Sequence, residues 1–550
     1  MRIVLASVAG LLLASGSASA VSTGLANVQT FLTDYDPDLS TPEAVAVSTP
    51  DGAFVYVVAR TGGVVVFARD PGTGKLTKVS VTNATTLGST FRPDGMVMGP
   101  GSAMAYVGDD GSVRVFARDF LSGALTQVQQ VPSTLALTKD LAFSPDAMSL
   151  YVIAFRDDLV QVYARDTGTG LLTAGQLVVD GQNGVTGLHG TAAIDVSPDG
   201  LHVYVATRGD GIVVFGRDVM TGNLTFIESI TEVVPDTLAV LNDMVISADG
   251  LFVYVAPDDS SVNGPTVYAR NPTTGHLTFV ETGAPYGLLG PNPFTRRTRA
   301  LALSPDGSQL VGVTRNTISL YDRDATTGHL TFVGAETQAG ERVQMSPDGL
   351  HVYVASGFAN VSAYRQLSIA CAPVPLAGCR TTTLSGHASV RLQGVAPSDA
   401  SRFDWKVRQA QASDVADLGD VVAGTDDVIA CVYDASASPQ PVFDTVAPAG
   451  GVCDERACWK TRGSTPGKRH QKYKDSDRRP DGMDAIDLKE GADGFSSLKV
   501  KAKSTFMMPP TFPLTPPVRV QLQTVAGTCW EGVFSTPQLN DGYHFRAKSD

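Results

Sequence analysis

The stretch VSPDGLHVYVA at residues 196–206 decides the fold, because close variants of it recur along the first two-thirds of the chain. Each copy contains an alternating apolar run, a Pro-Asp-Gly turn and a Val-Tyr-Val strand. Such alternation is typical of half-buried β-strands, and Asp-Gly marks a tight hairpin turn, where glycine tolerates a positive φ. The other copies are VSTPDGAFVYVVA (47–59), VMGPGSAMAYVG (97–108), LAFSPDAMSLYVIA (141–154), ISADGLFVYVA (246–256), LALSPDGSQLVGV (301–313) and MSPDGLHVYVA (345–355).

A second phrase follows the first six copies. VVVFARDPGTGKLTKV at 64–79 is its first example, with two further strands joined by a Thr-Gly turn. A unit therefore has four short antiparallel strands, and successive units begin about 50 residues apart, which is typical of propeller blades. The faces of such blades are buried only against neighbouring blades. The seven copies predict an all-β fold that begins with a seven-bladed β-propeller.

The last unit is incomplete. Its third strand is Val361 to Arg365, but no Thr-Gly turn and no fourth strand follow. The stretch from Ala26 to Asp34 is strand-like and belongs to no unit. We predict that it supplies the missing outer strand and closes the ring, which leaves no open seam. A flexible N-terminal tail is the alternative.

The composition changes at residue 368. Residues 1–368 carry the whole net charge of −13, because 369–550 hold 21 basic and 21 acidic residues. An acidic propeller repels phosphate, so we expect no nucleic-acid partner. We divide the chain into a signal peptide (1–20), the propeller (21–368) and a smaller β-rich accessory domain (369–550).

The first 20 residues have the pattern of a signal peptide. Arg2 is the charged start, Ile3 to Ala14 the apolar stretch, and Ala18-Ser19-Ala20 the small-residue cleavage site. A buried first strand is the alternative. The apolar stretch is too short to cross a bilayer, and no later run reaches 18 apolar residues. The sequence predicts a secreted, periplasmic or cell-surface protein, cleaved near Ala20, without a transmembrane segment.

All six cysteines lie in the C-terminal region. An even number in an exported chain favours disulfides over zinc, and the sequence does not choose among the 15 pairings. Cys458-Trp459 and Cys529-Trp530 suggest strands near one core, and one candidate pairing joins these two cysteines. The disulfide candidates are Cys371, Cys379, Cys431, Cys453, Cys458 and Cys529.

One segment of the C-terminal region is strongly basic. Lys460 to Arg479 holds eight Lys and Arg against Asp475 and Asp477. Such a segment could contact an anionic surface or the acidic propeller. We expect a mobile, solvated loop instead.

Strand alternation sorts the propeller loops onto two faces. The Pro-Asp-Gly and Thr-Gly turns share one face, and the longer, variable loops share the other, where sites are usually built. Four histidines occupy repeat positions in the scaffold, which leaves His189 on the variable face. Polar residues recur just before the first strand of most units, where they would ring the mouth of the central channel. With His189, the candidate ligand-binding residues are Glu43, Asp94, Asp140, Asp243, Arg299, Glu341 and Arg342.

Acids beside arginines and one histidine could bind a polar, carboxylate- or sugar-bearing ligand and supply a general base. Wet channel residues without a role are the alternative. The Asp-Asp pairs at 109–110, 157–158 and 258–259 could hold Ca²⁺. They come from different blades, so we expect solvated turn residues and no metal site.

In these repeats the chain resembles the lactonase-type seven-bladed propellers and the related repeats named after a Tyr-Val-Thr-Asn strand. The resemblance rests on Ser-Pro-Asp-Gly-x-x-Val-Tyr-Val and Val-x-Val-Phe-x-Arg-Asp-x-x-Thr-Gly-x-Leu-Thr, and it covers about residues 24 to 366. The resemblance implies the propeller fold. Members of this family include sugar-lactone and phosphogluconolactone hydrolases. The family also includes exported propellers without a known role, so we assign no catalytic residue of the family to a position in this sequence. More weakly, DWKV, ACWK and GTCWEGVFS resemble a tail of exported bacterial proteins, with no activity attached.

Two functions remain open. The first is a secreted scaffold that binds a small polar ligand, or an extracellular protein or surface, through the variable face and channel mouth. The alternative is a lactonase-like hydrolase that opens an extracellular sugar lactone. The sequence indicates no cofactor, and it leaves the catalytic residues and the oligomeric state undetermined.

Overall fold

The computed structural model describes residues 24–550, apart from 33–35, 84–86, 88–90, 133–134, 136–137, 235–236, 239, 259–263, 283–296, 338–339, 357–359, 367–369, 395–400, 425, 438–439, 451, 454–455, 477, 479–481 and 505–509. The predicted signal peptide lies outside the described residues. Among them, no helix is both long and apolar enough to cross a bilayer.

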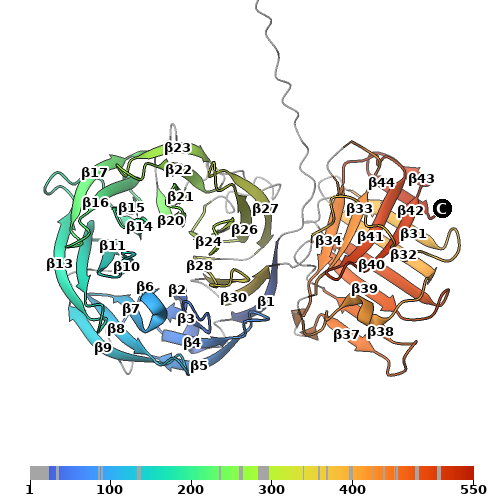
Figure 1. Cartoon of the computed structure of the whole chain (residues 1–550), viewed down its shortest axis with the longest axis horizontal. Helices are drawn as coiled ribbons and strands as arrows, with labels where there is room; N and C mark the ends of the chain where they lie inside the picture. The colour runs from blue at the N-terminus through green and yellow to red at the C-terminus, as the bar shows by residue number, and fades with distance from the viewer. Residues whose placement is uncertain are drawn as a thin grey trace, which may run out of the picture.

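Seven four-stranded antiparallel sheets form a ring around a central axis (Figure 1), which confirms the predicted propeller. The innermost strands are β2 (Pro42–Val47), β6 (Gly95–Met98), β10 (Thr138–Phe143), β14 (Thr191–Val196), β20 (Leu241–Ile246), β24 (Ala300–Leu303) and β28 (Arg342–Met345). The second strands are β3 (Phe54–Ala59), β7 (Met104–Asp109), β11 (Ser149–Ala154), β15 (His202–Thr207), β21 (Phe252–Pro257), β25 (Gln309–Val313) and β29 (His351–Ser356).

The outer half of each blade contains the second repeated phrase. The third strands are β4 (Gly63–Arg69), β8 (Ser112–Arg118), β12 (Leu159–Arg165), β16 (Ile212–Arg217), β22 (Thr266–Arg270), β26 (Thr317–Arg323) and β30 (Asn360–Gln366). The outermost strands are β5 (Leu76–Thr82), β9 (Leu125–Pro132), β13 (Leu172–Val179), β17 (Leu224–Ile230), β23 (Leu277–Thr282), β27 (Leu330–Thr337) and β1 (Leu25–Leu32). Short 3-10 turns at Pro37–Leu39 (η2) and Pro100–Ser102 (η3) and a hairpin of β18 (Glu232–Val234) and β19 (Thr237–Leu238) complete the propeller.

The N-terminal strand closes the ring. β1 pairs antiparallel with β30, with Leu25 opposite Gln366, and becomes the outermost strand of the last blade. Leu25 and Val28 are buried in the cores of that blade and its neighbours. The predicted closure is therefore confirmed, and the last blade has no unpaired outer edge.

The repeated Arg and Asp join neighbouring blades. Arg217 donates from Nε to the Tyr151 hydroxyl (2.8 Å), from Nη2 to Asp146 (2.7 Å) and from Nη1 to the Gly200 carbonyl (3.1 Å). The Asp of this turn thus also anchors the Arg of the next blade. The same pair forms at four other seams: Arg69 with Asp348, Arg118 with Asp51, Arg270 with Asp199, and Arg323 with Asp249.

Two seams lack this ion pair. Arg165 still donates to the Tyr106 hydroxyl (2.7 Å), but Gly101 stands where the other units have Asp. At the last seam, Gln366 takes the position of the Arg, since its backbone N–H donates to Leu350 as the repeat requires. A hollow of about 560 Å³ lies beside Gln366 and Asp306.

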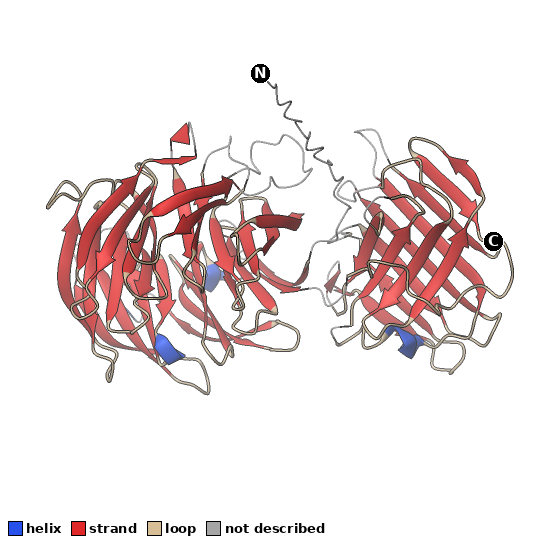
Figure 2. Ribbon diagram, turned by 45° about the horizontal axis from the view of Figure 1, so that its top comes forward, coloured by secondary structure: helices blue, strands red, loops and turns tan. Residues whose placement is uncertain are grey.

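The C-terminal region is a β-sandwich, and Figure 2 shows it beside the propeller. One sheet has eight strands in the order β37-β38-β39-β40-β32-β31-β44-β43, and the other has the order β34-β33-β41-β42. Trp405, Trp459 and Trp530 are fully buried between them. The strands are β31 (Ala388–Gln393), β32 (Ser401–Ala410), β33 (Val428–Tyr433), β34 (Phe443–Ala447), β35 (Val452–Cys453), β36 (Arg456–Ala457), β37 (Trp459–Arg462), β38 (His470–Lys474), β39 (Met483–Lys489), β40 (Ser496–Ser504), β41 (Val518–Thr524), β42 (Cys529–Phe534), β43 (Pro537–Asn540) and β44 (His544–Lys548), with one 3-10 turn, η5 (Val415–Leu418).

All six cysteines are paired, which confirms the preference for disulfides. The bonds are Cys371–Cys431, Cys379–Cys529 and Cys453–Cys458. The candidate pairing of Cys458 with Cys529 is wrong, because β37 and β42 belong to different sheets that share only the core. Disulfides persist in oxidising compartments, so they are consistent with an extracellular or periplasmic protein.

The basic segment is not the loop expected from its composition. β37 and β38 pair as a hairpin, with Lys460 opposite Lys472, and Trp459 and Tyr473 anchor it in the core. A buried ion pair also joins the two domains: Arg365 of β30 donates from both terminal nitrogens to Asp427, just before β33. The C-terminal domain is thereby attached to the last blade.

Candidate functional site

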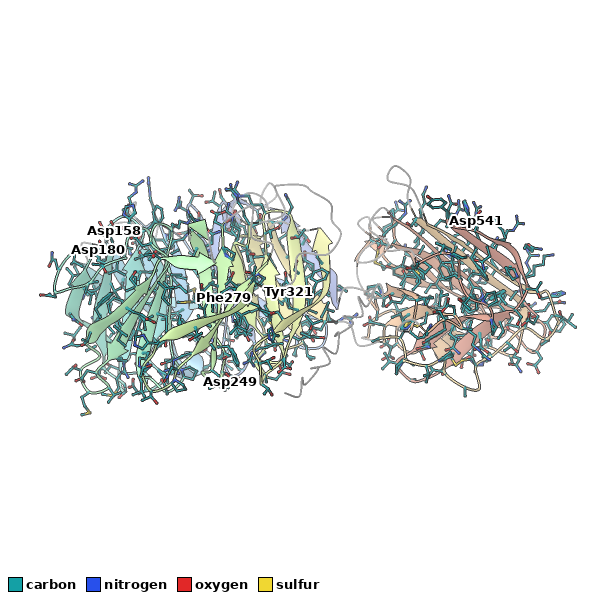
Figure 3. The ribbon with its side chains drawn as sticks, turned by 90° about the horizontal axis from the view of Figure 1, so that it is seen from above. Asp158, Asp180, Asp249, Phe279, Tyr321 and Asp541 are labelled. Carbon is teal, nitrogen blue, oxygen red and sulfur yellow. A yellow bond between two sulfur atoms is a disulfide. The ribbon has the colours of Figure 1, made fainter. Side chains whose placement is uncertain are left out.

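The propeller loops divide between two faces. Asp158 lies between the second and third strands of its blade, Asp180 follows an outermost strand, and Asp249 lies in a repeated turn. Figure 3 shows Asp158 and Asp180 on one side of the propeller and Asp249 on the other. The variable loops therefore share one face, as expected from the strand alternation.

Three aspartates bridge the innermost strands. Asp140 accepts from the backbone N–H of Ile194 (3.0 Å), and Asp195 from that of Ile246 (2.9 Å). Asp243 accepts from the N–H of Leu301 (2.8 Å). These N–H groups belong to the free, axial edges of the next blades, which would otherwise be unpaired.

The same three carboxyls titrate abnormally. Burial raises the pKa of Asp195 to about 7 and that of Asp243 to about 6, and it also raises the pKa of Asp140. All three side chains keep partial exposure, because water reaches the axis, but the surrounding strands displace most of the solvent. The channel thus contains carboxyls that gain a proton near neutral pH.

A compact ion cluster occupies one side of the channel mouth. Arg60, directly after β3, donates to Asp94 (2.5 Å) and lies 3.6 Å from Glu43 Oε1. Glu43 is the extra residue of a bulge in β2, which turns it away from the regular strand face. Burial raises the pKa of Glu43. The cluster thus sets one guanidinium against two carboxylates, so this side of the mouth does not favour an anionic ligand.

The opposite side of the mouth is differently arranged. The Arg299 side chain is 9% exposed, yet its Nη1 is 3.7 Å from Asp258 and its Nε is 3.9 Å from Glu341. Both distances are too long for a hydrogen bond, and Arg299 Nε has no hydrogen-bond partner among the described residues. Arg208 binds Asn242 through Nη2 (2.6 Å), but its Nε also has no partner in the described part of the chain. The buried Arg299 and the half-buried Arg208 thus each have one donor without a partner among the residues that the structure describes.

Lys139 adds a titratable cation to the mouth. It is the extra residue of a bulge in β10, just before Asp140. The nearby charge of Arg342, followed by burial, lowers the pKa of Lys139 to about 8. The lowered pKa of Lys139 indicates that the electrostatic potential around Lys139 and Arg342 is positive.

The structure brings most of the candidate residues together. Glu43, Asp94, Arg299, Glu341 and Arg342 lie at the mouth, and Asp140 and Asp243 lie on the innermost strands. His189 is different: its ring is 72% exposed and bonds Asp158 (3.1 Å), which raises the pKa of the histidine. Its backbone N–H donates to Asp210 (3.1 Å), so within the described part of the chain its hydrogen bonds lie outside the mouth cluster.

The Asp-Asp pairs are not all solvated turn residues. Asp109 is buried and binds Arg114 Nε at 2.8 Å, and Asp258 lies beside Arg299. The expectation of solvated carboxylates is wrong for these two, because Asp109 binds a buried arginine and the Asp258 side chain is only 13% exposed.

Sequence reasoning missed Arg60, Arg208 and Arg315, as well as Lys139. The three arginines occupy one repeat position, just after the second strand of a blade, where Asp258 also lies. Aligning the units at this position would have found them. Lys139 gives no such signal, because its place depends on the bulge.

Part of the propeller matches a family model in sequence. Residues 97–186 and 138–288 match the model described as "Lactonase, 7-bladed beta-propeller". This confirms the resemblance of the repeats to lactonase-type propellers. A search of curated proteins finds no match to the chain.

Solved structures with a similar fold have different activities in their names. The periplasmic gluconolactonase of Pseudomonas aeruginosa is 18% identical, covers 59% of this chain and 88% of its own, and has a TM-score of 0.44. Hydrazine synthase of Kuenenia stuttgartiensis is 20% identical, with 59% and 96% covered and a TM-score of 0.44. A protein from Lactobacillus plantarum is 22% identical, with 55% and 86% covered and a TM-score of 0.45.

Proposed function

We propose that the channel mouth binds a small anionic ligand bearing hydroxyl groups, such as a sugar acid. The observation that carries this proposal is Arg299, a nearly buried guanidinium. Its Nε has no hydrogen-bond partner within the described ranges, and the carboxylates of Asp258 and Glu341 stand beyond hydrogen-bond distance. A buried donor without an acceptor costs about 1–3 kcal/mol. A carboxylate between Arg299 and Arg208 would accept these donors in charge-assisted bonds.

The titrating groups give this binding a pH dependence. Lys139, with a pKa of about 8, is charged below that pH. Asp243 and Asp195, with pKa values of about 6 and 7, lose their negative charge as the pH falls. Both changes favour an anion, so affinity should rise as the pH is lowered from about 9 to about 5.

Isothermal titration calorimetry of the full chain with gluconate tests the proposal. Arg299→Gln should weaken binding at least tenfold, since it removes the buried donor. Arg297→Gln is the matched control, because the Arg297 side chain is 53% exposed and near the same Asp258. Equal affinities of the two variants, or equal binding of the neutral polyol sorbitol, would contradict an anion site.

Hydrolysis of a lactone at the same site is the second candidate function. The family match favours it, and a carboxyl that titrates near neutral pH, such as Asp243, is suited to general-base work. A panel of aldonolactones distinguishes the two functions. Turnover above the spontaneous rate that Asp243→Asn abolishes would establish the hydrolase. Gluconate binding without turnover would leave a binding protein.

A further inference from the structure

The outer face of the eight-stranded sheet is densely basic. Alternate residues such as Trp405 and Val500 are buried in the sandwich core, so the residues between them face outward. Fourteen of the outward or exposed residues on these strands are Lys or Arg, against three carboxylates in their described part, Asp404, Asp484 and Asp487. The basic residues are Arg391, Arg402, Lys406, Arg408, Lys460, Arg462, Lys472, Lys474, Lys489, Lys499, Lys501, Lys503, Arg546 and Lys548.

The strand register aligns lysines from distant parts of the sequence in one row. The row runs across seven strands, a width of about 29 Å at about 4.8 Å per strand. It contains a single carboxylate. From β37 to β44 it reads Lys460, Lys472, Asp487, Lys499, Lys406, Ser389 and Lys548.

This arrangement costs stability. Lys406 stands directly opposite Lys499, and Arg391 opposite Arg546, and like charges in such positions repel. A sheet that only needed a solvated surface would gain from alternating charge. We propose that this face binds a linear acidic polysaccharide, whose carboxylates or sulfates compensate the repulsion.

Two hollows on the face suit sugar rings. One, of about 680 Å³, is lined by residues that include Arg391, Lys406 and Arg546. The other, of about 560 Å³, includes Lys460 and Lys472 in its lining. The guanidinium groups offer paired donors that match the two oxygens of a carboxylate.

The chemistry of the face favours a polysaccharide over other polyanions. On the seven strands of the row, no outward position among the described residues holds a Trp, Tyr, Phe or large aliphatic side chain, and Leu539 of the edge strand β43 is the exposed apolar residue on this face. Proteins that bind single-stranded nucleic acids commonly stack the bases on aromatic side chains, and proteins that bind membranes through amphipathic elements insert apolar side chains, so this face lacks the features typical of both. The disulfides indicate an oxidising compartment, in which carbohydrate polymers are the common polyanions.

Binding of the full chain to immobilised polygalacturonate, at about 50 and about 200 mM salt, tests this proposal. The variant Lys406→Gln/Lys499→Gln/Lys548→Gln should bind about tenfold more weakly at low salt and depend less on salt, because three charge contacts are lost. Its melting temperature should not fall, since the substitutions relieve repulsion. The control Lys75→Gln/Arg92→Gln/Arg519→Gln removes the same charge from exposed positions elsewhere and should bind like the wild type.

Several results would overturn the proposal. Equal weakening by the two triple variants would show that only the net charge matters. Absence of wild-type binding to polygalacturonate at low salt would exclude the ligand class. Tighter binding to duplex DNA or to anionic phospholipid vesicles than to polygalacturonate would assign the face to those partners instead. Gluconate binding at the propeller is measured separately, so the outcomes do not depend on each other.

Discussion

Replacing Arg217 by methionine should destabilise the propeller by about 3.5 kcal/mol. The side chain is fully buried and holds Asp146, Tyr151 and Gly200 of two adjacent blades. Methionine fills much of the same space but donates no hydrogen bond, so the loss comes from the polar contacts.

The magnitude follows from the three contacts. The ion-paired bond to Asp146 contributes about 1.5–3 kcal/mol, and each bond from the guanidinium to an uncharged acceptor, Tyr151 or Gly200, contributes at least about 1 kcal/mol. The Asp146 side chain is 33% exposed and regains water when its partner is removed, so its contribution falls at the lower end. The sum is about 3.5 kcal/mol, or about 5 °C in the melting temperature of a domain of this size.

Urea unfolding, monitored by far-UV circular dichroism, measures the loss of stability. The repeat itself supplies the control. Arg165 occupies the same position in a seam where Gly101 replaces the Asp. Among the described residues its side chain donates to the Tyr106 hydroxyl and to the Ala147 carbonyl. Arg165→Met should therefore cost about half as much. Equal losses in the two variants, or a loss below about 1 kcal/mol for Arg217→Met, would refute the assignment of the ion pair as the main contact.

Two further predictions concern the seams and the channel. Gln366→Arg should raise the stability by about 1 kcal/mol, because the new guanidinium supplies a partner for Asp306 across the hollow of the last seam. The same urea titration measures this gain. A gain of the same size in the double variant with Asp306→Asn would contradict this reason. Asp195, whose pKa is raised to about 7, holds a proton in the folded chain that the unfolded chain releases above about pH 4, so it lowers stability as the pH rises from about 4 to about 7. Asp195→Asn should reduce the difference in melting temperature between pH 5 and pH 8, and an unchanged difference would show that other groups cause it.

The blade architecture is predictable because each unit carries its own local signals. Alternating Val and Tyr specify the strands, and the Asp-Gly and Thr-Gly turns specify the hairpins, so seven copies lead directly to seven blades. The role of β1 is also predictable, since the last unit lacks a strand that only Ala26 to Asp34 can supply. Each of these inferences uses residues close together in the chain or a simple count of strands.

The candidate site was predictable only in part. Asp94, Arg299 and Glu341 share a repeat position, so sequence alone brings them to one mouth. The unsatisfied state of Arg299 depends on the distances to Asp258 and Glu341, which no pattern records. His189 shows the converse, because its loop lies on the expected face but its ring turns outward to Asp158.

The sequence by itself determined the all-β class, the number of blades, the closure of the ring and the likeness to lactonase-type propellers, because these features repeat with a short period. Only the tertiary structure decided the disulfide pairing, the hairpin in the basic segment and the row from Lys460 to Lys548. Those features depend on strand register and on contacts between residues far apart in the chain. Composition cannot reveal them, since a shift of one residue in register would turn the same lysines to the opposite face of the sheet.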